Sequence, residues 1–419
     1  MKIIIIGSGL IGVTTAYFLR RRGYEVTVID REEGPGRETS FANGALLTPS
    51  MPEPWNAPGC WRVLLASLGR KDAAMQLRMR ALPALLGWGV EFLRNSKAAA
   101  FERNVLSNLR MALYSLEVMQ SLRQQTHIEY GRAVRGTLRV FRNRPALDGA
   151  FAAANRLASE GLRFRRLSKE ETVGIEPALE PITNQLTGAL HYETDETGDA
   201  HRFCVALADR AREQGVDFRF CTEVTSLEMR AGRVGAVVSA RERFVADKYI
   251  VAAGSYSTRL LRRIGVHVPV RPAKGYSITF DQSVPSLNIP VIDDHLHAGV
   301  VPLEGVIRVV GTAEFAGYDL TVNPDRIRNL LVLLQEVLPQ KQFDLVTGKS
   351  WCGLRPMSVD GVPIIGPTSV SNLLVNTGHG HLGWTMAAGS AQLLVDLLSG
   401  DSPFINPAPF ALARFSPAR

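Results

Sequence analysis

Apolar and polar positions alternate along the chain in a pattern that predicts strands followed by helices. Residues 3–6 are four isoleucines, a β-branched run that is typical of a strand buried on both faces of a parallel sheet. A helical pattern covers residues 11–22, and residues 25–30 alternate like a second strand. Near the other end, residues 372–376 predict a strand, and a helical pattern follows to about Leu398. This succession of strands and helices predicts an α/β fold.

The loop between the first strand and the first helix carries the glycine spacing of a dinucleotide-binding unit. Gly7, Gly9 and Gly12 follow the pattern GxGxxG, and Asp30 ends the second strand near the expected offset of ~20 residues. In such a unit Gly7 permits a tight turn, Gly9 lets the backbone approach a pyrophosphate, and Gly12 lets helix and strand pack closely. The carboxylate of Asp30 would accept hydrogen bonds from a ribose diol. The alternative is a glycine turn in an unrelated α/β unit.

The fingerprint does not distinguish FAD from NAD, but later segments favour FAD. Residues 38–45 (ETSFANGA) form a polar loop that would hold phosphates and a flavin edge, or else an ordinary surface turn. A buried-strand pattern over residues 248–253 ends in small residues, which lets the backbone pass close to a cofactor. Residues 377–385 (TGHGHLGWT) precede the C-terminal helix. The positive end of that helix would stabilise the negative charge of a reduced flavin, which NAD chemistry does not need.

Taken together, these segments resemble the D-amino-acid oxidase/glycine oxidase superfamily of FAD enzymes, and within it the bacterial D-amino-acid dehydrogenases. The resemblance runs from Met1 to about Gly400 and includes the motifs VAAGSYS, GLRP, DGVPIIG and NTGHGHLGWT. It implies a Rossmann-like FAD-binding domain interleaved with a mixed-sheet, α+β substrate domain. The expected boundaries are 1–60, 185–265 and 351–419 for the FAD-binding domain, and 61–184 and 266–350 for the substrate domain.

The resemblance also implies roles for individual residues. Arg355, in the GLRP motif, would fork onto a substrate carboxylate. Tyr276 would face the flavin from a strand, and His379 matches a histidine of the flavin-side loop. The alternatives are an ion pair within the protein for Arg355, closure of the pocket for Tyr276, and a hydrogen bond that holds the loop for His379. The expected FAD contacts are Gly7, Ser8, Gly9, Leu10, Ile11, Gly12, Asp30, Arg31, Ser40, Asn43, Gly44, Ala45, Val224, Ala253, Gly254, Gly353, Gly380, His381, Leu382, Gly383 and Thr385.

The activity that the resemblance implies is oxidation of D-amino acids by an FAD-dependent dehydrogenase, with substrates of the proline or 4-hydroxyproline type as one option. Hydride would pass from Cα to the flavin N5, the imine would hydrolyse to a 2-oxo acid and ammonia, and the electrons would go to a quinone or another respiratory acceptor. Two alternatives stay open. One is a glycine/sarcosine-type oxidase that uses O2, and the other is a non-catalytic flavoprotein subunit of a larger complex.

His295 and His297 depart from the related dehydrogenases, which carry a tyrosine-containing strand at this place. Their HxH spacing predicts that both imidazoles lie on one face of a strand. Since the sequence places no third ligand beside them, no metal site is predicted.

Composition and charge exclude several classes of protein. The 419 residues include 48 Lys and Arg against 40 Asp and Glu, a net charge of +8, and the charges are interspersed. Because no basic cluster is interleaved with aromatic residues, a nucleic-acid binder is not expected. The four cysteines lack CxxC spacing, which favours a reducing, cytoplasmic setting. No apolar run approaches the ~20 residues of a spanning helix.

One segment nevertheless suggests contact with a membrane surface. Residues 55–93 combine tryptophans, aliphatic residues and basic residues. This composition is compatible with amphipathic basic helices that lie against the inner face of a bacterial cytoplasmic membrane, close to a quinone. The alternatives are a helical hairpin packed on the substrate domain and an oligomer interface.

Overall fold

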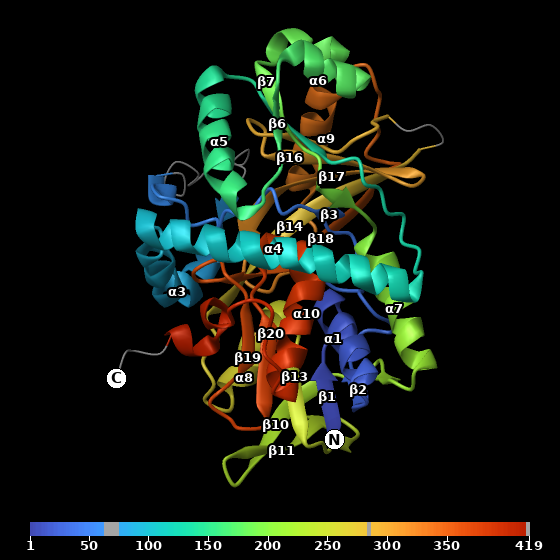
Figure 1. Cartoon of the computed structure of the whole chain (residues 1–419), viewed down its shortest axis with the longest axis vertical. Helices are drawn as coiled ribbons and strands as arrows, with labels where there is room; N and C mark the ends of the chain where they lie inside the picture. The colour runs from blue at the N-terminus through green and yellow to red at the C-terminus, as the bar shows by residue number, and fades with distance from the viewer. Residues whose placement is uncertain (63–74, 283–285, 416–419) are drawn as a thin grey trace.

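The computed structural model describes residues 1–62, 75–282 and 286–415 of the chain. Two large sheets form its two halves, and a long helix crosses the junction between them (Figure 1). The first sheet has six strands in the order β19-β20-β13-β1-β2-β9. These strands are β1 (Lys2–Ile6), β2 (Glu25–Ile29), β9 (Asp217–Arg219), β13 (Lys248–Val251), β19 (Ile364–Pro367) and β20 (Leu373–Thr377).

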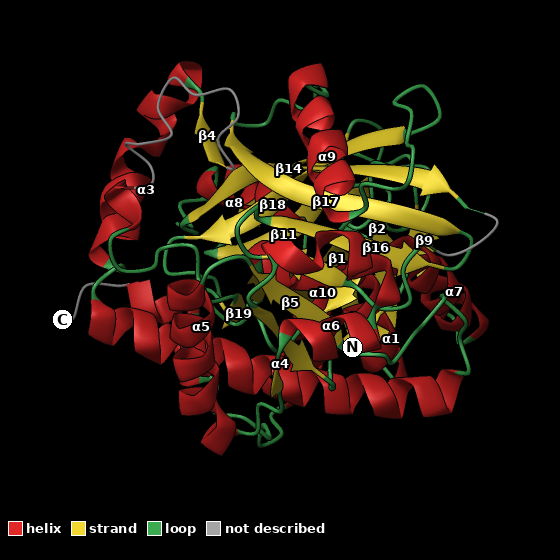
Figure 2. Ribbon diagram, turned by 90° about the horizontal axis from the view of Figure 1, so that it is seen from above, coloured by secondary structure: helices red, strands yellow, loops and turns green. Residues whose placement is uncertain are grey.

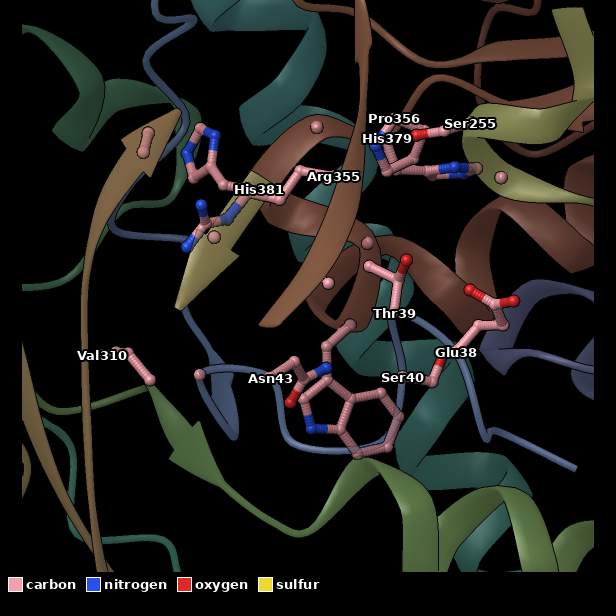
Figure 3. A pocket seen from close by; sticks show the side chains of 18 of the residues that line it. Glu38, Thr39, Ser40, Asn43, Ser255, Val310, Arg355, Pro356, His379 and His381 are labelled. Atoms are coloured by element: carbon pink, nitrogen blue, oxygen red, sulfur yellow. The ribbon is translucent and has the colours of Figure 1, made fainter. Parts of the chain in front are cut away.

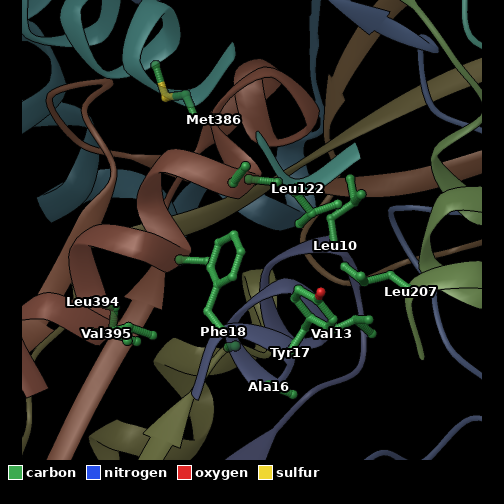
Figure 4. Packing of buried hydrophobic residues seen from close by; sticks show 14 of the residues in the cluster. Leu10, Val13, Ala16, Tyr17, Phe18, Leu122, Leu207, Met386, Leu394 and Val395 are labelled. Atoms are coloured by element: carbon green, nitrogen blue, oxygen red, sulfur yellow. The ribbon is translucent and has the colours of Figure 1, made fainter. Parts of the chain in front are cut away.

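The first sheet is parallel except for β19. The isoleucines of β1 are buried on both faces, as the uninterrupted apolar run predicts. Three helices cover one face: α1 (Leu10–Arg21), α7 (Ala200–Glu213) and α10 (Gly383–Ser399). Figure 4 shows their shared core, a single cluster that includes Leu10, Val13 and Phe18 of α1 and Met386 and Leu394 of α10. The predicted α/β fold is therefore confirmed.

The second sheet has nine strands and mixed directions. Its main path runs β18-β14-β17-β16-β15-β5-β7-β6, and β4 pairs with β17. Only the β15–β5 and β17–β4 pairs are parallel. The helix α9 (Pro324–Val337) lies across β14 and β17 (Figure 2). The strands are β4 (Met75–Leu77), β5 (Thr137–Phe141), β6 (Arg165–Leu167), β7 (Gly188–Tyr192), β14 (Val270–Asp281), β15 (Val291–Asp293), β16 (Ala298–Leu303), β17 (Val306–Phe315) and β18 (Lys349–Ser358).

The long helix α4 (Ala98–Thr126) joins the two halves and was not anticipated from the sequence. Its first turns pack in a cluster with β5 and α5 (Arg144–Leu157), whereas its later turns pack on α10. The approach to α10 is close, because Gly389 N–H donates to Ser115 Oγ at 3.0 Å and a Cβ at Gly389 would lie 2.9 Å from Ser115. Since α4 faces different partners along its length, its apolar positions do not form one stripe.

The remaining elements connect the two sheets or cover their edges. Among the described residues, no helix combines the length and the apolar character that crossing a bilayer requires. These elements are α3 (Leu82–Arg94), α6 (Lys169–Ile175), α8 (Ser257–Arg262), the small sheet β10 (Val224–Arg230), β11 (Arg233–Ser239) and β12 (Arg243–Phe244), and the pair β3 (Leu46–Leu47) and β8 (Glu196–Thr197).

The domain boundaries expected from the sequence remain a proposal. The strands β7 and β18 hydrogen-bond into the second sheet, although residues 185–265 and 351–419 were assigned to the FAD-binding domain. Both strands lie where the chain passes from one sheet to the other, so sequence pattern alone does not decide to which sheet they belong.

Gly12 offers a direct test of the packing between α1 and the loop that precedes it. A Cβ at Gly12 would collide with the carbonyl oxygen of Gly7. We expect Gly12→Ala to lower the free energy of unfolding by about 1–3 kcal/mol, because the helix must move to relieve the overlap. Thermal and denaturant unfolding measure this change. In the matched control Gly149→Ala, in α5, nothing lies within 4 Å, so stability should stay the same or rise. Equal stability of the two variants would contradict the packing argument.

Candidate active site

A cavity of about 1520 Å³ lies between the two sheets. This is larger than the roughly 300–1,000 Å³ of a typical small-ligand pocket, so it has room for a dinucleotide and a second molecule. One wall is formed where β1 and β13 end, the other by β14, β16 and β17. Because β1 lies between β13 and β2, this edge is a point at which the strand order reverses, which is where open α/β sheets bind ligands.

The N-terminus of α1 opens into the cavity. Gly7 has φ 108°, and a Cβ there would lie 2.6 Å from the carbonyl oxygen of Ala252. Ser8 donates to Asp30 Oδ2 through both its backbone N–H at 2.6 Å and its hydroxyl at 2.7 Å. No acidic side chain lies in the first turn of α1 to neutralise its positive end. These features suit the binding of a pyrophosphate next to Asp30.

The ETSFANG loop is fixed between the first helix and the second sheet (Figure 3). Ser40 Oγ accepts from the backbone N–H of Leu10 at 3.2 Å. Ser277 Oγ donates to the carbonyl oxygen of Ala42 at 2.7 Å, and Arg308 donates to that of Asn43 at 3.2 Å. The loop thus forms a defined wall of the cavity, and its contact with FAD stays a prediction.

Arg355 projects into the cavity from β18 (Figure 3). Its guanidinium lies over Gly275 of the neighbouring strand β14, where any Cβ would collide with it. It lies 5.6 Å from the ring centre of Trp55. Within the residues that the structure describes, its buried Nη1 has no hydrogen-bond partner. Burial lowers the pKa of Arg355 to about 10, so the group remains a cation at neutral pH.

The two histidines of the flavin-side loop differ in position. His379 is buried, and its Nε2 is hydrogen-bonded to Ser390 Oγ at 3.1 Å. His381 lies beside Arg355 in Figure 3, where its Nε2 donates to the carbonyl oxygen of Met51 at 3.3 Å. Burial lowers the pKa of His379 to about 3 and that of His381 to about 4. Both side chains are therefore neutral at physiological pH. The hydrogen bond between His379 and Ser390 is of the kind expected if His379 holds the loop in place.

Tyr276 lines the cavity, but its hydroxyl is directed at a protein group. It donates to Glu314 Oε2 at 2.5 Å. Glu314 is also paired with Arg78 and lies 3.5 Å from Lys274 Nζ. Burial and the hydrogen bond to Glu314 raise the pKa of Tyr276. The proton of this hydroxyl is thus held by Glu314, a partner that the sequence analysis did not identify because it lies on a separate strand.

Most of the residues expected to contact FAD do line the cavity. Four of the expected residues do not line it. The Ser8 hydroxyl is bonded to Asp30, and Gly12 packs against the backbone of Gly7. Leu382 belongs to the hydrophobic core, and Thr385 Oγ1 accepts from Thr48 N–H at 2.9 Å. The predicted residues that line the cavity are Gly7, Gly9, Leu10, Ile11, Asp30, Arg31, Ser40, Asn43, Gly44, Ala45, Val224, Ala253, Gly254, Gly353, Gly380, His381 and Gly383, together with Arg355, Tyr276 and His379.

His295 and His297 do not share a strand face, which corrects the prediction from their spacing. They lie in the turn between β15 and β16, and His297 has φ 51°. The turn forms because Asp293 Oδ1 accepts from the backbone N–H groups of His295 and Leu296. Within the described part of the chain, no group of three or more His, Cys, Asp and Glu is placed to hold a metal ion.

Comparison with known proteins agrees with this geometry. The family model described as FAD dependent oxidoreductase matches residues 2–397. The chain belongs to this family. FAD is therefore its cofactor, and the resemblance found in the sequence is confirmed. Gly7, the open helix end and Asp30 fit the dinucleotide part of FAD, and the ETSFANG and NTGHGHLGWT loops fit the flavin.

Members of the FAD-dependent oxidoreductase family resemble the chain over its full length. A D-amino acid dehydrogenase of Granulibacter bethesdensis is 40% identical, covering 99% of this chain and 100% of that protein. Another from Sinorhizobium medicae is 41% identical with the same coverage. Among solved structures, glycine oxidase from Geobacillus kaustophilus has a TM-score of 0.78 at 22% identity and covers 98% of both chains. The last likeness confirms the predicted Rossmann-like and mixed-sheet fold.

The buried His379 predicts how stability depends on pH. The unfolded chain binds a proton at this histidine below its ordinary pKa of 6.5, whereas the folded chain excludes it down to a pKa of about 3. The free energy of unfolding should therefore fall as the pH decreases from about 6.5, by up to about 1.4 kcal/mol per pH unit for this group.

Unfolding of the holoenzyme at several pH values measures this slope. His379→Gln should lose less stability on acidification than the wild type, while the exposed control His267→Gln should behave like the wild type. Identical slopes for all three proteins would contradict a neutral His379.

Proposed function

We propose that this flavoenzyme is a D-amino-acid dehydrogenase whose substrate carboxylate binds Arg355. The observation that carries the proposal is the cation in the cavity wall whose buried Nη1 has no partner among the described residues. A buried cation is costly without an anion, and a guanidinium binds a carboxylate through two parallel hydrogen bonds. The names of the full-length relatives support the choice of D-amino acids.

The residues around Arg355 position the substrate. Gly275 and Trp55 hold the guanidinium plane, so a bound carboxylate has a defined orientation. FAD, when bound, supplies the two-electron oxidation of the Cα–N bond by accepting hydride. His379 and His381 are neutral and hydrogen-bonded, so the ammonium proton leaves to water, or the amine binds in its neutral form. The released imine then hydrolyses to a 2-oxo acid and ammonia.

The finer aspects of the proposal concern the acceptor and the substrate. We propose a quinone or another respiratory acceptor, which is supported by the relatives being named dehydrogenases. Substrates of the proline or 4-hydroxyproline type remain one option. Their cyclic imine products would persist longer before hydrolysis than the open-chain imines of other amino acids. The alternative function is that of a glycine/sarcosine-type oxidase that uses O2. The 22% identity to glycine oxidase concerns the fold alone and does not favour it.

Anaerobic addition of single amino acids to the purified holoenzyme tests the proposal. We expect D-enantiomers to bleach the flavin absorbance and L-enantiomers to leave it unchanged. The expected effect of Arg355→Ala is full retention of FAD with slower bleaching, by about 100-fold or more, which corresponds to the ~2–5 kcal/mol of a buried charged contact. Arg355→Lys should recover part of the rate, because it keeps the charge without the bidentate geometry.

A matched control is Lys349→Ala, on the same strand, whose exposed ammonium pairs with Asp281. Its bleaching rate should equal that of the wild type. Loss of FAD from Arg355→Ala would show that Arg355 holds the cofactor instead. Faster bleaching by glycine or sarcosine would favour the oxidase, and no bleaching by any amine would favour a non-catalytic subunit.

We also propose that the face formed by α3 contacts a membrane. Trp88 is buried and its Nε1 donates to the carbonyl oxygen of Pro269 at 3.1 Å. On the opposite side of α3, the side chains of Leu86 and Val90 lie one helical turn apart and are 67% and 52% exposed. Met79, just before the helix, is 73% exposed. An apolar face of this kind beside arginines suits the headgroup region of an anionic bilayer. Residues 63–74 of the segment 55–93 lie outside the described residues.

Sedimentation with anionic liposomes at low salt tests this contact. We expect the wild type to co-sediment and the double variant Leu86→Ser/Val90→Ser to bind roughly tenfold more weakly, because two exposed apolar side chains that would enter the bilayer are lost. Val346→Ser removes an even more exposed apolar side chain elsewhere, and this variant should bind as the wild type does. If the wild type stays in the supernatant, α3 is not a membrane face.

A further inference from the structure

A second polar group faces the cavity at a place that the proposed chemistry does not use. Glu53 lies in the irregular segment after β3 and lines the cavity close to Trp55, which itself contacts Arg355. Two further charged residues line the same wall: Arg139 on β5, and Asp294 directly after β15. Since β5 and β15 are parallel neighbours, the pairing of the second sheet places these two side chains together.

Within the described residues, the charges on this wall leave Glu53 without an ionic partner. Arg139 donates to Asp294 Oδ1 through both Nε at 3.0 Å and Nη2 at 2.6 Å, so that pair is neutral. The adjacent Asp293 is paired with Arg142 at 2.9 Å. Among the described residues, no cation lies within salt-bridge distance of the Glu53 carboxylate, although the charges of Arg139 and Asp294 both reach it.

Glu53 is half-buried, and its surroundings disfavour the charged form of its carboxyl group. Burial raises its pKa, and the nearby Arg139 offsets only part of that rise. Tyr192, Asp195, His295 and His297 are further titratable groups near this wall among the described residues. A carboxylate in such a place is stabilised by a hydrogen-bond donor or a cation that enters the cavity, for the same reason that Arg355 is stabilised by an anion.

We infer that Glu53 is a specificity-determining residue that binds the substrate side chain and favours D-amino acids whose side chain ends in a cationic hydrogen-bond donor. The inference rests on the proposed function, in which Arg355 holds the substrate carboxylate. Arg355 and Glu53 then form two poles of one cavity, positive for the carboxylate and negative for the far end of the side chain. Arg139, paired with Asp294, lies near the negative pole without bonding to it.

The test compares two substrates of similar length, D-lysine and D-norleucine, which differ in the terminal ammonium. The variant is Glu53→Gln, which keeps the shape and removes the charge. We expect kcat/KM for D-lysine to fall about 10- to 100-fold, the factor that corresponds to one charged hydrogen bond. The value for D-norleucine should be little changed.

A binding experiment separates this inference from the proposed activity. A series of ω-amino carboxylates of increasing length is titrated into the oxidised holoenzyme by calorimetry, with the unsubstituted carboxylates as references. We expect one length to bind more tightly than its reference in the wild type, and this advantage to vanish in Glu53→Gln. The readout needs no turnover, so it remains decisive even if no D-amino acid reduces the flavin.

Glu336→Gln serves as the matched control, because Glu336 is an exposed glutamate that also lines the cavity. It should leave the preference for D-lysine and for the ω-amino carboxylates unchanged. An equal loss for D-lysine and D-norleucine in Glu53→Gln would overturn the inference, since Glu53 would then act on the reacting amino group. Unchanged kinetics and binding for every ligand would overturn it as well.

Discussion

The guanidinium of Arg355, buried at the wall of a cavity with its Nη1 unpaired, imposes the main physical constraint on this molecule. A cation in that position is stable only if its surroundings hold it rigidly and leave it one open direction. The structure meets both conditions. The β14–β18 pairing places Gly275 opposite Gly353 and leaves a flat space for the guanidinium, and Trp55 covers part of it. The open direction is the cavity.

Several ionisable groups in and around the cavity are arranged so that they do not compete for Arg355. His379 and His381 are kept neutral by burial, and neither offers an anion. Glu314 is engaged by Tyr276, which lines the cavity, and by Arg78 and Lys274. Asp294 is engaged by Arg139. Because each of these carboxylates already has its donors, the carboxylate of a substrate is the anion best placed to bind Arg355.

The position of the cavity depends on how the two sheets are held together. The parallel sheet presents the open end of α1, and the mixed sheet presents Arg355 and Tyr276. The helix α4 spans the junction, and its contact with α10 is as close as a glycine allows. The hydrogen bonds of Ser277 and Arg308 to the ETSFANG loop add a second connection. In the proposed function, a cofactor held by one sheet would thereby be brought against a substrate held by the other.

The sequence by itself determined the local features: the buried strand β1, the glycine turn before α1, Asp30 at the end of β2, and the motif that contains Arg355. These follow from short-range rules, since strand period, glycine conformation and helix ends are set by a few neighbouring residues. The sequence pattern did not reveal α4, because its apolar positions face two separate clusters. It also misplaced His295 and His297, because an Asx turn at Asp293 overrides their strand spacing.

Only the tertiary structure decided which charges meet. Glu314 reaches Tyr276 from a neighbouring strand, and Glu53, Arg139 and Asp294 come from three segments that share no motif. Electrostatic pairing depends on distances of a few ångströms and on burial, and neither quantity is encoded in residue spacing along the chain. Residue spacing also does not show that Arg355 lacks a carboxylate partner among the described residues. That becomes visible only when the cavity walls are assembled in three dimensions.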